Sequence, residues 1–338
     1  MRLVHERTEL RSALEGAKSE AARSFGDDEV YIEKAIVRPR HIEMQILADE
    51  HGHLVYLGER ECSIQRRHQK VVEEAPSAIV DDDMRRRMGE VAVRVARAAN
   101  YTNAGTVEFL VDAGKNFYFL EMNTRLQVEH PVTELVTGLD LVHLQILIAS
   151  GGELPFRQED VTIRGHAIEF RICAEDPDNH FFPSPGKITM LQVPAGPGIR
   201  HDSGSYEGWT VPIDYDPLLA KLIGYGSDRK QATMRLNRAL TEYFVAGIKT
   251  NIPLFQRILQ DPNFQAARLD TGYLERLLHE PPASPESSVA AEVAAIAAAL
   301  FVALSPANEG RAVQSSSGGD GAPVEANWKR TALREGLR

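Results

Sequence analysis

The sequence of 338 residues predicts an α+β protein built from two domains. Three observations support this fold class: helical and strand-like patterns succeed one another, neighbouring strands are joined by short polar turns, and the chain is longer than one average domain. We expect residues 1–160 to form a mixed or antiparallel sheet with helices, and residues 161–280 to form a second, α/β domain. Residues 281–338, rich in Ala, Ser and Gly, are expected to be largely a linker.

The first domain is expected to alternate helices with strands. Small and apolar residues recur at helical spacing over residues 8–25, 81–99 and 139–149. Strands are predicted at residues 29–36, 41–48 and 54–58, and a two-stranded hairpin across residues 106–129. Gly151 and Gly152 then interrupt the pattern, which places the domain boundary near residue 160.

The second domain opens with an alternating strand over residues 164–177. Shorter strands are expected at residues 188–193 and 216–225, and helices at 229–244 and 252–259. Residues 289–304 are apolar apart from Glu292 and predict a further helix, which is shorter than the ~20 residues needed to cross a bilayer. We therefore predict no membrane segment.

Charge and cysteine content limit the class of protein. The net charge of −10 argues against a general nucleic-acid binder, so that any anion site must be local. Cys62 and Cys173 are too few for a disulfide framework or a zinc ligand set. We expect both to be reduced, buried thiols in a cytoplasmic protein.

The most informative stretch runs from Glu121 to Glu129. In an extended chain its odd positions would project from one face, which would carry two carboxylates, two amides and a guanidinium. A half-solvated strand gives the same alternation, but this set of side chains suits metal, anion and proton transfer. The residues at the odd positions are Glu121, Asn123, Arg125, Gln127 and Glu129.

The preceding strand adds a third carboxylate. If Val111 faces Asn116 in the hairpin, Glu108 lies opposite Phe119, and Glu121 becomes its diagonal neighbour on the same face. Magnesium prefers oxygen ligands, usually one or two carboxylates completed by phosphates and water. The hairpin therefore predicts a nucleotide-associated metal site.

A second chemical stretch covers residues 62–76. Arg66, Arg67, His68 and Lys70 concentrate positive charge in an acidic chain, as an anion site requires. A solvated basic loop balanced by neighbouring glutamates is the alternative, and the stretch alone does not separate the two readings.

Taken together, these motifs resemble those of the biotin carboxylase family of ATP-grasp enzymes. The resemblance runs in order from Met1 to about Leu278, through EKAI and PRHIE, SIQRRHQKVVEEAP, GTVEFL, FLEMNTRLQVEHPVTE, RGHAIEFRICAEDP and FPSPGKI. It implies a partial ATP-grasp domain followed by a biotin carboxylase C-terminal domain. Family members begin with a further domain and a glycine-rich ATP loop, so we expect this chain to be N-terminally truncated and inactive by itself.

The resemblance also implies roles for individual residues. The implied catalytic residues are Arg125, Glu129, Lys70 and Arg171, with Glu129 as general base and Arg171 contacting biotin. The implied ATP contacts are Glu33, Lys34 and Ile36 at the adenine, His41, Gln65 and His68 at the ribose and phosphates, and Glu108 and Glu121. Bicarbonate would be held by Lys70, Arg125, Gln127 and Val128, and the metal ions by Glu108, Glu121 and Asn123.

The implied reaction is the carboxylation of carrier-bound biotin by bicarbonate and ATP, through carboxyphosphate, with Mg²⁺ or Mn²⁺. It is the first half-reaction of acetyl-CoA carboxylase, which serves fatty acid biosynthesis, and of related acyl-CoA carboxylases. The implied partners are a biotin carboxyl carrier protein, carboxyltransferase subunits and a second copy of the chain. The sequence has no Met-Lys-Met tripeptide for biotin attachment. A different ATP-grasp carboxylate–amine ligase and a non-catalytic subunit remain as alternatives.

Overall fold

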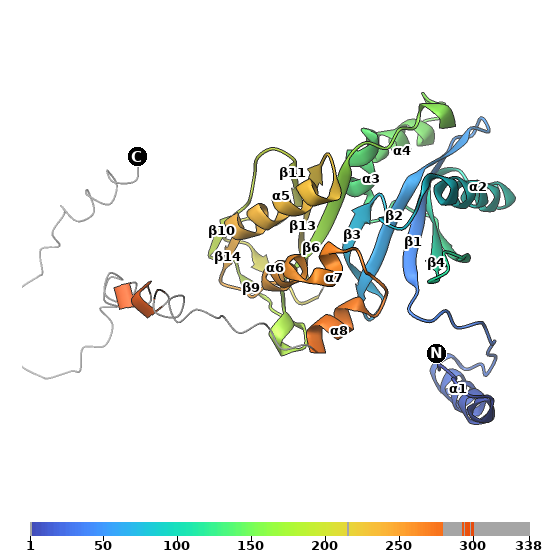
Figure 1. Cartoon of the computed structure of the whole chain (residues 1–338), viewed down its shortest axis with the longest axis horizontal. Coiled ribbons are helices and arrows are strands. Elements are labelled where there is room, and N and C mark those ends of the chain that lie inside the picture. The colour runs from blue at the N-terminus through green and yellow to red at the C-terminus, as the bar shows by residue number, and fades with distance from the viewer. Residues whose placement is uncertain (1, 215, 280–292, 294, 298, 301–338) are drawn as a thin grey trace, which may run out of the picture. The chain divides into compact units, whose positions relative to one another are not determined.

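One eight-stranded antiparallel sheet organises the chain up to Pro281 (Figure 1). The computed structural model describes residues 2–214, 216–279, 293, 295–297 and 299–300. The strand order is β11-β13-β6-β3-β2-β1-β4-β5, and every neighbouring pair is antiparallel. Its members are β1 (Arg40–Ala48), β2 (Leu54–Arg66), β3 (Gln69–Ala75), β4 (Asn103–Val111), β5 (Phe117–Asn123), β6 (His166–Cys173), β11 (Ile199–Ser203) and β13 (Leu218–Gly226).

Helices cover both faces of this sheet. The α-helices are α1 (Leu10–Phe25), α2 (Asp82–Ala98), α3 (His130–Thr137), α4 (Leu141–Ala149), α5 (Arg229–Glu242), α6 (Ile252–Gln260), α7 (Pro262–Gln265) and α8 (Tyr273–His279). Short 3₁₀ turns occupy η1 (Arg7–Glu9), η2 (Gln158–Asp160) and η3 (Pro177–Asn179). Paired short strands complete the described part: β7 (Glu175–Asp176) with β8 (Phe182–Pro183), β9 (Gly186–Lys187) with β12 (Thr210–Val211), and β10 (Met190–Gln192) with β14 (Phe244–Ala246).

Strand alternation divides the sheet into an apolar face and a polar face. Ile42 of β1 packs with α2, and Ile168 of β6 packs in the apolar cluster that includes α5 and α6. The cross-strand register puts these two residues on the same face. On the opposite face, the same strands present Glu43 and Glu169, and α3 and α4 pack there. The candidate site lies on this polar face.

Most predicted helices and strands are present in the structure. The two helices of the first half at residues 81–99 and 139–149 correspond to α2 and α4, and Asp81 caps α2 by accepting a hydrogen bond from the Met84 N–H. The predicted helix from residue 8 corresponds to α1. Both cysteines are buried, as expected. The predicted tail from residue 281, apart from six positions between 293 and 300, lies outside the described residues.

The predicted strand at residues 29–36 is wrong. This segment has no regular structure, and Tyr31 and Ile32 are 84% and 67% exposed. Alternating apolar and charged residues favour an extended chain, but a strand also needs a neighbouring strand to bond its backbone, and none of the described strands is paired with it. The structure also contains α3, which the sequence reasoning did not predict.

Within the described residues, no single helix is long and apolar enough to cross a membrane. Taken together, α3 and α4 reach the required length and composition, but the two helices are bent by 98° relative to each other.

Candidate active site

Lys70 contacts three carboxylates on the polar face of the sheet. Its ammonium donates hydrogen bonds to Glu108 Oε1 at 2.8 Å, to Glu129 Oε1 at 2.7 Å and to Glu43 Oε2. These acceptors come from β4, from the loop before α3 and from β1, so one side chain joins three parts of the chain. Only 11% of the Lys70 side chain is exposed, which makes this a nearly buried cluster.

The charges in this cluster stabilise one another. Burial alone would raise the pKa of Glu43, but Arg60 and Lys70 lower it below its ordinary value. Burial would likewise raise the pKa of Glu108, and hydrogen bonding to His41 together with the Lys70 charge lowers it. Burial would lower the pKa of Lys70, yet Glu43 and the other nearby anions raise it. Glu43, Glu108 and Lys70 are therefore each stabilised in the charged form.

Arg60 is a second buried cation beneath this cluster. Its side chain is fully buried, and its Nε donates to Glu43. Its remaining nitrogens donate to Gln45 Oε1 at 2.7 Å, Thr133 Oγ1 at 3.0 Å, Thr106 Oγ1 at 3.2 Å and Gln127 Oε1 at 3.0 Å. Because every partner is held in the interior, Arg60 fixes the orientation of the Glu43 and Gln127 side chains.

Arg171 extends the cluster across to β6. Its Nη2 donates to Glu129 Oε2 at 2.9 Å, and its Nε donates to Glu73 Oε1 at 2.7 Å. Glu129 therefore receives one hydrogen bond from Lys70 and another from Arg171, one on each carboxylate oxygen. Two cations converging on one carboxylate form a local site for small anions in an otherwise acidic chain.

The expected metal residues meet at the β4–β5 pair. Glu108 lies directly opposite Glu121 rather than opposite Phe119, with an irregularity between Glu108 and Phe109, so the predicted diagonal arrangement is wrong by two positions. Asn123 Nδ2 lies 3.0 Å from Glu108 Oε1 and 3.4 Å from Glu121 Oε1. These three side chains supply the hard oxygen donors that Mg²⁺ prefers, and they fit such an ion. Glu121 is exposed at the sheet edge, where a phosphate could complete the coordination.

The predicted strand through Glu129 is also wrong, because β5 ends at Asn123. Beyond this point the chain turns toward α3, which begins at His130 with Pro131 in its first turn. Gln127 and Glu129 nevertheless return to the cluster, since Gln127 Nε2 donates to Glu108 Oε1 at 2.8 Å. Arg125 is exposed and lies 3.5 Å from Asn123 Oδ1. A folded loop, rather than a strand face, brings these side chains together.

The other residues expected to contact ATP lie in three separate places. His41 Nε2 lies 2.8 Å from Glu108 Oε2, and Gln65 Nε2 lies 2.8 Å from His41 Nδ1, so both adjoin the cluster. His68 is exposed in the β2–β3 turn. Glu33, Lys34 and Ile36 belong to the irregular segment before β1, and the Lys34 ammonium lies 5.1 Å from the centre of the Tyr118 ring.

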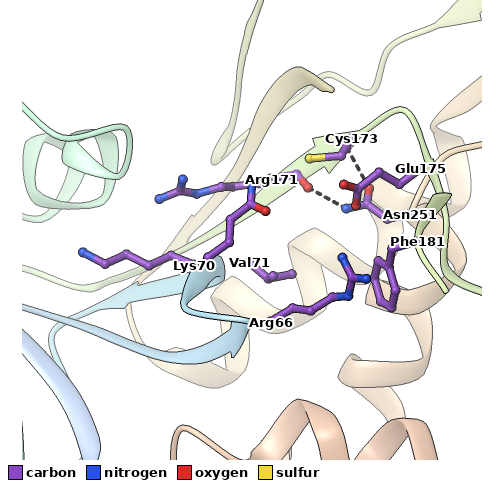
Figure 2. Close-up of a pocket in the computed structure, with 9 residues that line it drawn as sticks. Arg66, Lys70, Val71, Arg171, Cys173, Glu175, Phe181 and Asn251 are labelled. Carbon is purple, nitrogen blue, oxygen red and sulfur yellow. Dashed lines mark hydrogen bonds between the residues drawn. The ribbon is translucent and has the colours of Figure 1, made fainter. Parts of the chain in front are cut away.

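A pocket opens beside Lys70 and Arg171 (Figure 2). Figure 2 shows both side chains extending in the same direction, away from Phe181. Asn251 fixes β6 at this point by donating to the Arg171 carbonyl and accepting from the Cys173 N–H, each at 2.9 Å. At the other end, Arg66 stacks on the Phe181 ring with 4.0 Å between its guanidinium carbon and the ring centre. Three cationic side chains, Lys70, Arg171 and Arg66, therefore line the pocket.

The sequence reasoning missed several residues of this site. In a solvated basic loop Glu73 would be exposed, but it is fully buried against Arg171. The Lys221 ammonium donates to the Val128 carbonyl at 3.1 Å and so supports the loop before Glu129. The missed residues are Glu43, Arg60, Glu73, Glu169 and Lys221. Glu43, Glu169 and Lys221 each stand between two apolar residues of a strand, and this signal could have identified them. Arg60 and Glu73 lie beside other charged residues and give no such signal.

Both halves of the chain match known protein families. Residues 1–157 match the family model "Carbamoyl-phosphate synthase L chain, ATP binding domain", and residues 169–276 match "Biotin carboxylase C-terminal domain". A biotin carboxylase of Halalkalibacterium halodurans is 54% identical over 274 residues, which are 81% of this chain and 60% of that protein. Biotin carboxylase 2 of Bacillus subtilis is 53% identical over 278 residues, which are 82% of this chain and 62% of that protein.

A solved structure shares both the fold and much of the sequence. It is the biotin carboxylase domain dimer of Hydrogenobacter thermophilus 2-oxoglutarate carboxylase, in complex with MgADP, ADP and bicarbonate. The TM-score is 0.77 with 44% identity, over 83% of this chain and 62% of that one. The present chain thus spans about 60% of the relatives that it matches. Two family models in sequence, this identity and this fold together establish that the chain belongs to the biotin carboxylase family, with an ATP-grasp domain followed by the family's C-terminal domain.

Proposed function

We propose that this chain provides the site at which MgATP and bicarbonate carboxylate the biotin of a carrier protein. The observation that carries the proposal is the position of Glu129, which binds Lys70 through one oxygen and Arg171 through the other. Lys70 also binds Glu108, the residue opposite Glu121. A base, two anion-binding cations and a pair of metal-binding carboxylates are the groups that this reaction requires.

The proposed first step activates bicarbonate. Lys70 and Arg171 anchor the anion, and Glu129 removes its proton, so that a bicarbonate oxygen attacks the γ-phosphorus while ADP leaves. Mg²⁺ held by Glu108, Glu121 and Asn123 would offset charge on the transferred phosphoryl group. Bicarbonate must replace part of the present hydrogen bonding of Lys70 and Arg171, because both cations are bound to Glu129 in this structure.

The proposed second step consumes the carboxyphosphate. This intermediate yields CO₂ and phosphate, and the phosphate takes the proton from biotin N1′. The resulting biotin anion attacks CO₂ to form carboxybiotin. Arg171 would stabilise the negative oxygen of the biotin anion by hydrogen bonding, since its guanidinium reaches the pocket beside Lys70 (Figure 2).

The remaining roles are proposals of the same kind. Adenine would be held by Glu33, Lys34 and Ile36, the ribose and phosphates by His41, Gln65 and His68, and bicarbonate also by Arg125, Gln127 and Val128. The partners that we propose are a biotinylated carrier protein, carboxyltransferase subunits and a second copy of the chain. The H. thermophilus relative is a dimer, which supports the last of these. We propose an acyl-CoA such as acetyl-CoA as the final carboxyl acceptor.

Bicarbonate-dependent hydrolysis of MgATP tests the proposal. The chain is assayed beside a chimera in which the segment of the H. halodurans biotin carboxylase that precedes the matched region is fused before Met1. We expect the chimera to release phosphate only when bicarbonate is present, and free biotin to accelerate the release. A chimera that folds and binds MgATP, yet hydrolyses it equally with and without bicarbonate, would contradict the proposal.

A further inference from the structure

Behind the Arg171–Glu129 ion pair lie two buried glutamates to which the proposed reaction gives no role. Glu73 of β3 and Glu169 of β6 are directly opposite residues of an antiparallel strand pair, and both are 0% exposed. Opposite residues in such a pair project from the same face, with Cβ atoms about 4.5–5.5 Å apart. The two carboxyl groups are therefore close neighbours in the interior.

The surrounding cations do not neutralise both carboxylates. Arg171 donates to Glu73 Oε1 and to Glu129. Lys221, on the neighbouring strand β13, donates to the Val128 carbonyl and lies 3.6 Å from Asp202. In the part of the chain that the structure describes, neither oxygen of Glu169 has a hydrogen-bond partner, and Glu73 Oε2 has none either.

The helix that covers this region adds apolar side chains. Val132 and Val136 of α3 pack with Ala75, Ala167 and Ile223. Ala75 and Ala167 are two residues from Glu73 and Glu169 on their own strands, and Ile223 of β13 lies opposite Glu169.

The titratable residues of α3 are engaged elsewhere. His130 Nδ1 lies 2.8 Å from the Gln127 carbonyl, and Glu134 Oε2 accepts from Arg200. The charged groups that act on Glu169 are thus Glu73, Lys221, Arg171 and Glu129.

Two carboxylates in one buried place favour the binding of a proton. An ionised carboxylate without a partner is unfavourable in the interior, and a second one nearby adds repulsion. Burial and the Glu73 charge raise the pKa of Glu169 well above its ordinary value. Burial also raises the pKa of Glu73 to about 7, although the Arg171 charge opposes this shift.

We propose that Glu73 and Glu169 share one proton at neutral pH, and that the single negative charge of the pair positions the Arg171 guanidinium against Glu129. Both are positioning residues. Glu73 acts through its hydrogen bond to Arg171 Nε, and Glu169 holds the proton that leaves Glu73 charged. The use of Arg171 on biotin rests on the proposed function, whereas the shared proton does not.

Nuclear magnetic resonance of the full chain tests this proposal without any ligand. The carboxyl carbons of ¹³C-labelled glutamate are followed between about pH 5 and pH 9. We expect one glutamate to keep its protonated form through neutral pH in the wild type, and to lose this signal in Glu169→Gln. The matched control is Glu275→Gln, at an exposed position on α8, which should leave the signal unchanged.

The Arg171 Nε–H proton provides the readout of positioning. The rate at which this proton exchanges with water should be unchanged in Glu169→Gln, because glutamine replaces a neutral acid. The rate should be roughly tenfold faster in Glu73→Gln, because this variant loses the charged acceptor of the hydrogen bond. A wild type in which every glutamate is ionised at neutral pH would overturn the proposal. So would a protonated signal that persists in Glu169→Gln, since it would then come from another buried carboxyl such as Glu61, whose pKa burial also raises.

Discussion

The Lys70 ammonium lies 2.7 Å from Glu129 Oε1, and this contact ties β3 to the loop that precedes α3. Glu129 is 2% exposed and lies six residues beyond the end of β5, so no strand fixes its position. Lys70 and Arg171 hold it instead. The position of the proposed base thus depends on the cations that would also bind the substrate anion.

Replacing Lys70 by methionine should destabilise the protein. The change removes one cation from a buried cluster and leaves Glu43, Glu108 and Glu129 with fewer compensating charges. Breaking a buried ion pair in this way costs about 3–5 kcal/mol of unfolding free energy. Urea denaturation at neutral pH measures the loss.

Lys115→Met is the matched control for this experiment. The Lys115 side chain is 51% exposed and forms one ion pair with Asp81 at 3.2 Å. Its replacement should change the unfolding free energy by less than about 1 kcal/mol. Equal losses in the two variants would show that the Lys70 cluster does not contribute to stability as a buried network.

Replacing Glu121 by glutamine should weaken divalent metal binding. Glu121 and Glu108 lie opposite each other, and the substitution removes one of these two proposed carboxylate ligands. The fold should be unchanged, because Glu121 is exposed. We expect Mn²⁺, used as the probe ion, to bind about tenfold more weakly, equivalent to about 1.4 kcal/mol. Electron paramagnetic resonance measures the free ion. Wild-type affinity in Glu121→Gln, with Glu275→Gln as control, would exclude Glu121 as a ligand.

Asp49 should make stability depend on acid pH. Burial alone would raise the pKa of Asp49, but hydrogen bonds from the Leu154 and His53 backbone N–H groups, among others, lower it to about 2. A carboxyl with a depressed folded-state pKa stabilises the fold above its ordinary value of 3.8, and this stabilisation is lost as the pH falls from 3.8 to about 2.

The variant Asp49→Asn tests this contribution. It should lower the unfolding free energy by about 1–2 kcal/mol at neutral pH, which is less than the full pKa shift implies because water screens part of the effect at this loop. Near pH 2 the loss should be much smaller, because the charge of Asp49 then contributes little stability. Chemical denaturation at both pH values gives the difference. A loss of the same size at both would assign the effect to packing rather than to charge.

Replacing Glu129 by glutamine in the chimera should slow bicarbonate-dependent phosphate release. Glutamine keeps the shape of the side chain but cannot accept the bicarbonate proton, and loss of a general base costs about 10²–10⁴-fold in rate. MgATP binding, followed by calorimetry, should be retained, which separates loss of the base from loss of the site. A rate within threefold of that of the parent chimera, roughly 0.6 kcal/mol, would argue against this role.

Most of the helices and strands could be predicted because their signals are local. A polar cap and an apolar stripe define α2, and alternation defines the strand that becomes β6. The segment at residues 29–36 has the same local signal but lacks a neighbouring strand. Pairing partners are distant in sequence, and no local pattern reports them.

The site was predictable only in part for the same reason. The acidic and amide residues of the stretch from Glu121 to Glu129 were identified from one strand-like pattern, although a loop brings their side chains together. Val111 pairs with Phe117 rather than with Asn116, because the turn between β4 and β5 is one residue longer than predicted. The irregularity between Glu108 and Phe109 adds a second residue, so Glu108 pairs with Glu121 rather than with Phe119. Arg60 and Glu169 were missed since burial of a charged side chain depends on the tertiary structure.

The antiparallel pairing of β3 with β6 determines how the molecule can be divided. β3 belongs to the segment that ends at residue 157, and most of β6 belongs to the segment that begins at residue 169. Cleavage of the polypeptide between them, followed by separation of the halves, would leave a bare β3 edge that invites aggregation. Genetic recombination that replaced one half would have to supply a strand that still pairs with β3 or β6 of the remaining half. We therefore expect the two halves to be inherited together.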